Sequence, residues 1–189
     1  MSIINTINLF AVTALLTTTL TSRVWGMEGH NQHAGMKMDQ KKHSTATSGR
    51  ERLDKKTAQE IIAVLKANEG LHWSFFKYDG AKVEMAAKAV KQNISQIGDP
   101  KIAGRLEFSG KKLDEIKLAN GRKHNNQLYH LVSMALIHLV KKYDLGSNYN
   151  VYSCPMVKKQ WIQNSSKLSR VNNPYSSAMP HCGVQESKF

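Results

Sequence analysis

Apolar residues recur every three or four positions between residues 55 and 146, in four runs separated by short breaks. Asp79-Gly80 and Gly98-Asp99-Pro100 interrupt this pattern, and Gly146 ends it. The strongest run contains Leu128, Leu131, Val132, Ala135, Leu139 and Tyr143. Such spacing is typical of amphipathic helices. Because short connections between helices favour antiparallel neighbours, the sequence predicts a mainly α fold, with an antiparallel four-helix up-down bundle over residues 55–146.

Local signals refine two of these helices. Thr57-Ala-Gln-Glu60 matches a capping box, in which the threonine oxygen and the glutamate side chain satisfy free backbone N–H groups. The third run is the weakest prediction, because Gly104 and Gly110 lie inside it. A glycine in a helix interior costs about 1 kcal/mol relative to alanine.

The helical pattern stops at Ser147. Residues 147–189, here named the C-terminal lobe, contain Asn-Pro and Pro-His steps that indicate turns. Tyr149, Val151 and Tyr152-Ser-Cys-Pro indicate an extended segment. For the rest we expect an irregular lobe that carries the cysteines and methionines and has no long helix. Trp161 and Tyr175 are the large side chains expected to pack this lobe against the bundle.

The chain has only two cysteines, and each lies close to a methionine. Cys154 is followed by Pro155 and Met156, and the second group is Met179, Pro180, His181 and Cys182. Thiolate and thioether are soft ligands that suit Cu(I) and, by extension, Ag(I). We therefore consider Cys154, Met156, Met179, His181 and Cys182 as candidate metal ligands. A structural disulfide between the cysteines is the competing interpretation, stabilising the fold by roughly 3–4 kcal/mol. Both hold if the metal binds only when the pair is reduced.

The N-terminal part resembles an export signal. Residues 1–26 contain an apolar run from Ile7 to Leu20 and a plausible cleavage point after Gly26. Residues 27–54 have few aliphatic or aromatic residues, so we expect a disordered tail. The tail contains six further candidate copper ligands: Met27, His30, His33, Met36, Met38 and His43. These features predict a periplasmic or otherwise exported protein that keeps no stable membrane span after cleavage.

Charge and motifs exclude other classes of function. Lys and Arg total 27 against 14 Asp and Glu, which favours anionic partners. The basic residues are spread along the chain and form no nucleic-acid motif. The sequence contains no nucleophile elbow, no His-Glu-x-x-His and no phosphate loop, so we expect no enzyme. His130, Met134 and His138 share one helix face, which is typical of a boundary between core and solvent. His72, beside Trp73, is expected to be a packed or surface histidine.

Four motifs in the C-terminal lobe resemble the signature of a known bacterial domain of unknown function. They are Cys154-Pro155-Met156, Trp161-Ile162-Gln163, Asn173-Pro174-Tyr175 and Met179-Pro180-His181-Cys182-Gly183. That domain occurs in small exported proteins and at the ends of periplasmic adaptor subunits of copper/silver efflux systems. The resemblance covers about residues 57–183. It implies a helical bundle and a link to copper or silver handling.

Two hypotheses about function follow. The first is an exported copper-binding protein that buffers Cu(I) or Ag(I), or transfers it to an efflux or resistance system. Its partner would be an efflux adaptor or another periplasmic copper carrier. The alternative is a disulfide-stapled basic module that docks an acidic protein or an envelope polymer. The first needs the cysteines together with methionine and histidine, whereas the second needs only the lysines and the disulfide.

Overall fold

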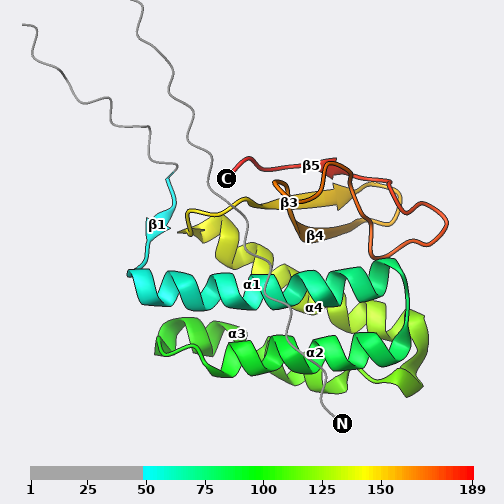
Figure 1. Ribbon diagram of the computed structural model, residues 1–189, viewed down its shortest axis with the longest axis horizontal. Coiled ribbons are helices and arrows are strands. Elements are labelled where there is room, and N and C mark those ends of the chain that lie inside the picture. Colours follow the sequence, from blue (N-terminus) through cyan, green and yellow to red (C-terminus); the bar gives the residue numbers. More distant parts are fainter. Residues whose placement is uncertain (1–48) are drawn as a thin grey trace, which may run out of the picture. The chain divides into compact units, whose positions relative to one another are not determined.

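The computed structural model describes residues 49–189, and four α-helices account for most of them (Figure 1). The helices are α1 (Lys55–Phe76), α2 (Gly80–Ser95), α3 (Pro100–Glu115) and α4 (Gly121–Lys142), with a 3-10 turn η1 (Leu118–Asn120) before α4. The mainly α prediction is therefore confirmed. Within residues 49–189, no helix is both long and apolar enough to cross a membrane. The predicted export signal and the Met/His segment up to residue 48 lie outside the described residues.

Aspartates begin the first three helices. Asp54 precedes α1, and its Oδ1 accepts a hydrogen bond from the Thr57 backbone N–H at 3.0 Å. Asp79 and Asp99 cap α2 and α3 in the same way. The predicted capping box at Thr57 is wrong, because the helix begins three residues earlier. Glu60 instead accepts the backbone N–H of Gly98 at 3.0 Å and ties α1 to the loop before α3.

Gly104 and Gly110 do not interrupt α3. A Cβ added at either position would meet no atom within 4 Å, so neither glycine serves a close approach. The helix persists because Ile102, Leu106 and Leu113 are almost completely buried. Burial of one such side chain contributes about 1.5–3 kcal/mol, which exceeds the cost of a glycine.

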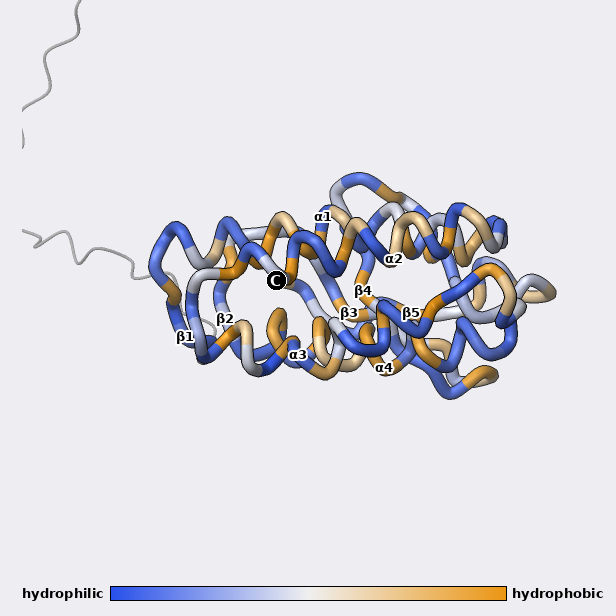
Figure 2. The backbone as a smooth tube through the Cα atoms, turned by 90° about the horizontal axis from the view of Figure 1, so that it is seen from below, coloured by the Kyte–Doolittle hydropathy of each residue, from blue (hydrophilic) through white to orange (hydrophobic). Residues whose placement is uncertain are grey.

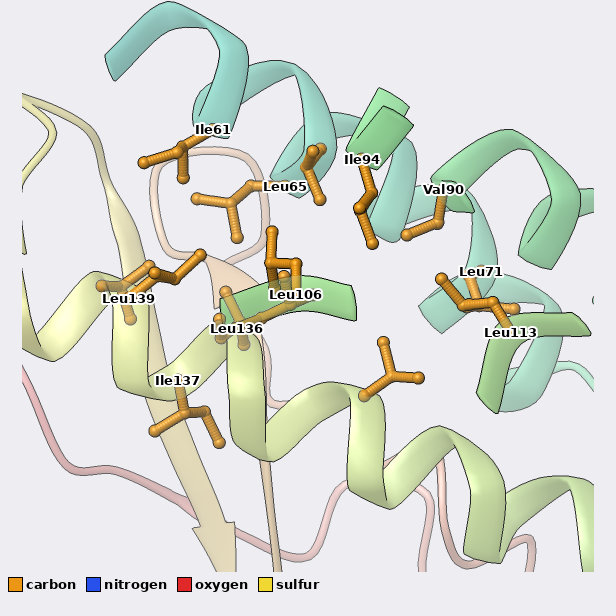
Figure 3. Close-up of a cluster of buried hydrophobic side chains, with 14 of the residues drawn as sticks. Ile61, Leu65, Leu71, Val90, Ile94, Leu106, Leu113, Leu136, Ile137 and Leu139 are labelled. Atoms are coloured by element: carbon orange, nitrogen blue, oxygen red, sulfur yellow. The ribbon is translucent and has the colours of Figure 1, made fainter. Parts of the chain in front are cut away.

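The core lies where apolar stripes of the four helices meet. Figure 2 shows apolar positions recurring along each helix, and Figure 3 shows their side chains converging from different helices. The labelled set is Ile61, Leu65 and Leu71 of α1, Val90 and Ile94 of α2, Leu106 and Leu113 of α3, and Leu136, Ile137 and Leu139 of α4. Val151 and Ile162 of the C-terminal lobe belong to the same cluster. The lobe and the helices therefore share one core.

The C-terminal lobe contains a sheet, which corrects the expectation of an irregular lobe. Strands β3 (Tyr149–Cys154) and β4 (Lys159–Asn164) form an antiparallel hairpin, and β5 (Val184–Gln185) pairs antiparallel with β3. The order is β4-β3-β5, and the sheet packs on α4 (Figure 1). Tyr149 to Tyr152 are all buried, so β3 lacks the alternation of a half-exposed strand. The extended segment predicted from Tyr149 to Cys154 is therefore confirmed as β3, whereas its pairing with β4 and β5 was not predicted.

Residues 49–54 belong to the fold, although the sequence assigned them to the tail. Strand β1 (Glu51–Arg52) pairs in parallel with β2 (Tyr143–Asp144), directly after α4. Arg50 strengthens this link: its Nη1 donates to the carbonyls of Val140 and Tyr143, both at 3.3 Å. Its Nη2 lies 3.1 Å from the Asp144 carboxylate. The boundary of the tail at residue 54 is therefore placed too late.

Candidate thiol site

The first arm of the site is the hairpin turn between β3 and β4. Cys154 ends β3 and pairs with Lys159, so Pro155 to Lys158 form the turn. Lys158 has φ 51°, in the left-handed region that closes a tight turn. This geometry aims the backbone N–H groups of Met156 and Val157 at the Cys154 sulfur. Proline at position 155 has no N–H of its own and fixes the start of the turn.

The second arm is a loop that Asn173 closes. The backbone N–H of Asn173 donates to the Pro180 carbonyl at 2.7 Å, and its Nδ2 donates to the Cys182 carbonyl at 3.1 Å. Its Oδ1 accepts the backbone N–H of Tyr175 at 2.9 Å. Asn173 is fully buried. These bonds hold both ends of the loop 173–182 together and so fix Cys182.

Gly183 explains the Cys-Gly pair. Its φ is 154°, and a Cβ there would lie 2.8 Å from the Ser153 carbonyl oxygen and 2.8 Å from Cη2 of Trp161. Real Cβ atoms do not approach that closely, so only glycine lets the second arm lie flat against β3 and Trp161. The strand β5 begins at the next residue. Cys182 is thereby delivered to the end of β3, where Cys154 lies.

The two thiols meet there. Both cysteines are free, Cys154 is 1% exposed, and Cys182 is half-buried. Burial alone would raise the pKa of Cys154. Hydrogen bonds from Cys182, from the Val157 and Met156 N–H groups and from the Asn173 side chain nevertheless bring that pKa below its ordinary value. Hydrogen bonding to Cys154 raises the pKa of Cys182, and burial and the negative charge of Cys154 act in the same direction.

The other predicted ligands differ in exposure and in the contacts they make. Met156 is 69% exposed on the turn. Met179 is half-buried, and its backbone N–H donates to the Ser176 hydroxyl at 3.1 Å. The Nδ1 of His181 lies 2.8 Å from the Val171 carbonyl, and its ring lies 5.8 Å from that of Phe76. In residues 49–189 no three His, Cys, Asp or Glu side chains gather as metal ligands. The structure thus brings Cys154 and Cys182 together but leaves His181 outside the pair.

Aromatic side chains fix the lobe on α4. The hydroxyl of Tyr175 donates to the Ser133 hydroxyl at 3.0 Å, and its ring lies 5.7 Å from that of Tyr129. Trp161 is fully buried and meets Tyr175 at 6.2 Å in an edge-to-face arrangement. The prediction is confirmed for Tyr175, whereas Trp161 packs within the lobe, in a cluster with Tyr152 and Cys154. Gln163 supports the adjoining loop, since its amide bonds the Arg170 carbonyl at 2.7 Å and the Asn172 N–H at 3.0 Å.

Asn173 is the site residue whose role the sequence did not reveal. Its position in Asn-Pro-Tyr was the available signal, because an asparagine that precedes proline commonly caps a turn with its side chain. What no local pattern could show is that the same side chain reaches Cys182 and Cys154.

The second histidine and methionine group behaves as a boundary stripe, as predicted. His130 is half-buried with its ring edge-on to Tyr175, Met134 is 41% exposed, and His138 lies 3.3 Å from the Arg105 guanidinium. Burial, followed by the charge of Lys159, lowers the pKa of His130. Nothing in this stripe gathers ligands around one point.

The tail candidates Met27, His30, His33, Met36, Met38 and His43 lie outside the described residues. Comparison of the chain with protein-family models, with curated proteins and with solved structures finds no match.

Proposed function

We propose that the protein binds one soft monovalent ion, Cu(I) or Ag(I), between the sulfurs of Cys154 and Cys182. The observation that carries the proposal is the contact between two free thiols from separate arms, one of which is surrounded by hydrogen-bond donors. Donors aimed at a sulfur favour its thiolate form, which is the form that binds metal. The ion is the cargo of the protein, and its binding releases the thiol protons.

The size of the ligand set favours Cu(I) and Ag(I) over zinc. Structural zinc takes four ligands in a tetrahedron, usually cysteine and histidine. Here the pair has no third histidine, cysteine or carboxylate in the described residues. Two soft sulfur ligands suit Cu(I), and Met179 or Met156 supplies the thioether that completes the shell. Cys182 is half-buried, so an ion enters and leaves from its side.

The wider role is an exported carrier. We infer that the mature protein buffers copper or silver in the periplasm and passes it to an efflux or resistance system, with an efflux adaptor or another periplasmic copper carrier as partner. The resemblance of the four motifs to the domain found beside copper/silver efflux adaptors supports this role, as does the Met/His-rich composition of residues 27–48. We further infer that α1 to α4 form an antiparallel up-down bundle that acts as a scaffold, without catalysis.

The test is anaerobic competition of the reduced full chain against a Cu(I) chelator strong enough to strip thioether sites. We expect Cys154→Ser and Cys182→Ser each to weaken the binding of one equivalent by more than the roughly 100-fold that loss of a supporting residue costs. Met134→Leu, which removes an exposed thioether from α4, is the matched control and leaves the affinity unchanged. Of the variants Met179→Leu and Met156→Leu, the one that weakens Cu(I) binding identifies the third ligand.

A double Cys154→Ser, Cys182→Ser variant with unchanged Cu(I) affinity would overturn the proposal. The alternative, a disulfide-stapled basic docking module, is favoured by the same contact between the sulfurs. It predicts that the protein isolated from its compartment has no free thiol and that strong reductant gives it no Cu(I) site. Thiol labelling of that protein, before and after reduction, separates the two.

A further inference from the structure

The surface around Cys182 extends from the β3–β4 turn to the end of α1. On one side, the Met156 backbone N–H faces the Cys182 sulfur, and the Met156 side chain is 69% exposed. On the other side, the exposed His181 ring lies 5.8 Å from the Phe76 ring, which stacks on Trp73 at 5.2 Å. These contacts make one continuous surface, here named the Cys182 face, with the half-buried Cys182 in its middle.

The aromatic half of the Cys182 face is open to a partner. Trp73 is 45% exposed, although tryptophan is highly buried on average. Gly70 lies one turn earlier on α1 and is exposed, and a Cβ added there would meet no atom of the described residues within 4 Å. The helix beside the indole is therefore uncovered. Because aromatic residues and methionine are enriched at protein–protein contacts, this composition favours a protein partner.

Basic side chains accompany this face without carboxylates of their own segment to neutralise them. Residues 155–183 contain no aspartate or glutamate, and their basic residues are Lys158, Lys159, Lys167 and Arg170. Lys167 is paired with Glu69 of α1 at 2.7 Å. The other three form no ion pair with any residue that the structure describes.

Two of these cations flank Cys182. Lys158 is exposed in the β3–β4 turn. Arg170 is exposed on the other side, since it precedes Val171, whose carbonyl lies 2.8 Å from Nδ1 of His181. Cations on both sides of a half-buried metal ligand attract an anionic partner and orient it over that ligand.

The charges and the exposed rings define the partner. We propose that the Cys182 face docks an acidic segment of the protein that exchanges the ion, with carboxylates on Lys158 and Arg170 and an apolar side chain on Trp73. This inference rests on the function proposed above, from which it takes the cargo, and it adds the chemistry of the partner. The partner reaches the ion from the side of Cys182, because Cys154 is only 1% exposed. A second copy of the chain does not fit, because it would bring the same unpaired cations to the contact.

The binding test uses the reduced, metal-free full chain, observed by backbone NMR. The probe is a synthetic peptide of alternating aspartate and serine with one leucine and one methionine at its centre. We expect saturable shifts at residues 73, 76, 156–159, 170 and 181–183. The same peptide with lysine in place of aspartate produces none, and added salt weakens the binding of the acidic peptide because exposed charges are screened. Shifts that map to α2 and α3 instead would overturn the proposal.

Charge variants test whether the position of the cations matters. Lys158→Gln combined with Arg170→Gln weakens peptide binding about threefold to tenfold, the loss expected for two exposed charge pairs. Lys55→Gln combined with Lys101→Gln removes the same charge from exposed positions in the first turns of α1 and α3 and changes the binding far less. Equal losses in the two double variants would contradict the proposal, because net charge alone would then explain them.

Aromatic variants test the apolar contact. Trp73→Ala weakens peptide binding more than about tenfold, as expected of a central interface residue. Phe108→Ala, which removes a 55% exposed ring from α3, leaves the binding unchanged. If Trp73→Ala does not fold, as judged by its helical circular dichroism, the charge variants decide. Single-stranded oligothymidine is the competing polyanion, and tighter binding of it than of the peptide at the same residues assigns the face to nucleic acid and overturns the proposal.

Transfer of Ag(I) separates this proposal from the function on which it rests. The chain loaded with one Ag(I) passes it to the methionine peptide faster than the Lys158→Gln, Arg170→Gln variant does. Equal transfer rates contradict docking at the Cys182 face. A chain that retains no Ag(I) contradicts the function proposed above, whereas the peptide shifts of the metal-free chain still decide the docking.

Discussion

Single residues decide the geometry of the thiol pair, and Asn173 does so with its backbone N–H and both polar atoms of its side chain. Its backbone N–H, Nδ2 and Oδ1 hold Pro180, Cys182 and Tyr175, while its side chain also supports Cys154. Gly183 acts by having no side chain, and His72 influences the stability of the fold by being buried. Substitution of each of these three residues therefore has its own expected effect.

Asn173→Ala removes the support of both sulfurs. We expect Cu(I) affinity to fall roughly 10–100-fold, the usual effect of losing a residue that orients metal ligands. The free energy of unfolding falls by about 1–3 kcal/mol, because buried groups lose their partner. Chelator competition and urea unfolding measure the two effects. Asn93→Ala, which loses only a bond to its own helix at Ala89, is the control and changes neither.

Gly183→Ala forces a methyl group against β3 and Trp161. We expect a loss of about 1–3 kcal/mol in the free energy of unfolding, which is typical of overpacking, together with weaker metal binding as Cys182 is displaced. Gly104→Ala is the matched control, because space is open there and alanine is the better helix residue. It should stabilise the protein by about 0.5–1 kcal/mol. Equal urea midpoints for the two variants would contradict this account.

His72 makes stability depend on pH. Its pKa is about 4 in the folded protein and about 6.5 in the unfolded chain, so the unfolded state binds a proton first as the pH falls. Stability is therefore lost between about pH 6.5 and 4, amounting to about 2 kcal/mol at pH 5. Urea unfolding at pH 7 and pH 5 should show this loss in wild type and in the exposed-site control His124→Gln. His72→Phe should retain more of its stability at pH 5.

At the scale of elements, aspartate N-caps set where helices begin. Asp99 accepts the Ile102 N–H at 2.9 Å and precedes Pro100 at the first helical position. We expect Asp99→Ala to cost about 1 kcal/mol, the usual value of an N-cap. Glu107→Ala, on the exposed face of the same helix, loses only its contact with Lys111 and should change stability far less. Thermal unfolding of both variants tests the difference.

The sequence predicted elements whose signal is local and missed those whose signal is not. The four helices follow from periodicity, because each has one face toward the core. An extended segment was predicted where β3 lies, but β4 and the sheet were missed, because consecutive buried residues hide the alternation that marks a strand. The sequence predicted a capping box at Thr57, whereas the folded chain uses Asp54 as the N-cap of α1. The proximity of Cys154 and Cys182 was predicted because both are soft ligands. The orientation of the His181 ring depends on its contact with the Val171 carbonyl, which the spacing of residues in the sequence does not indicate.

At the scale of the whole molecule, metal binding and folding are linked. The two arms of the thiol site lie far apart in sequence, so the site exists only in the folded chain, and an ion bound there stabilises the fold. Free Ag(I) at about 100 times its Kd should add about 2.7 kcal/mol. A thermal scan should therefore show a higher Tm with Ag(I) in reduced wild type. The Cys154→Ser, Cys182→Ser variant should lose the part of the shift that belongs to this site, and an equal shift in both would place the stabilising ion elsewhere.

The pairing of β1 with β2 determines which element first bears a pulling force that is applied N-terminal to residue 49. The strand and the Arg50 guanidinium both attach to the C-terminal end of α4. Tension is therefore transmitted to α4 before it reaches the start of α1. The same helix carries Ser133, which holds Tyr175 and with it the loop that presents Cys182. A partner that captures the N-terminal segment pulls on the helix that supports the thiol pair.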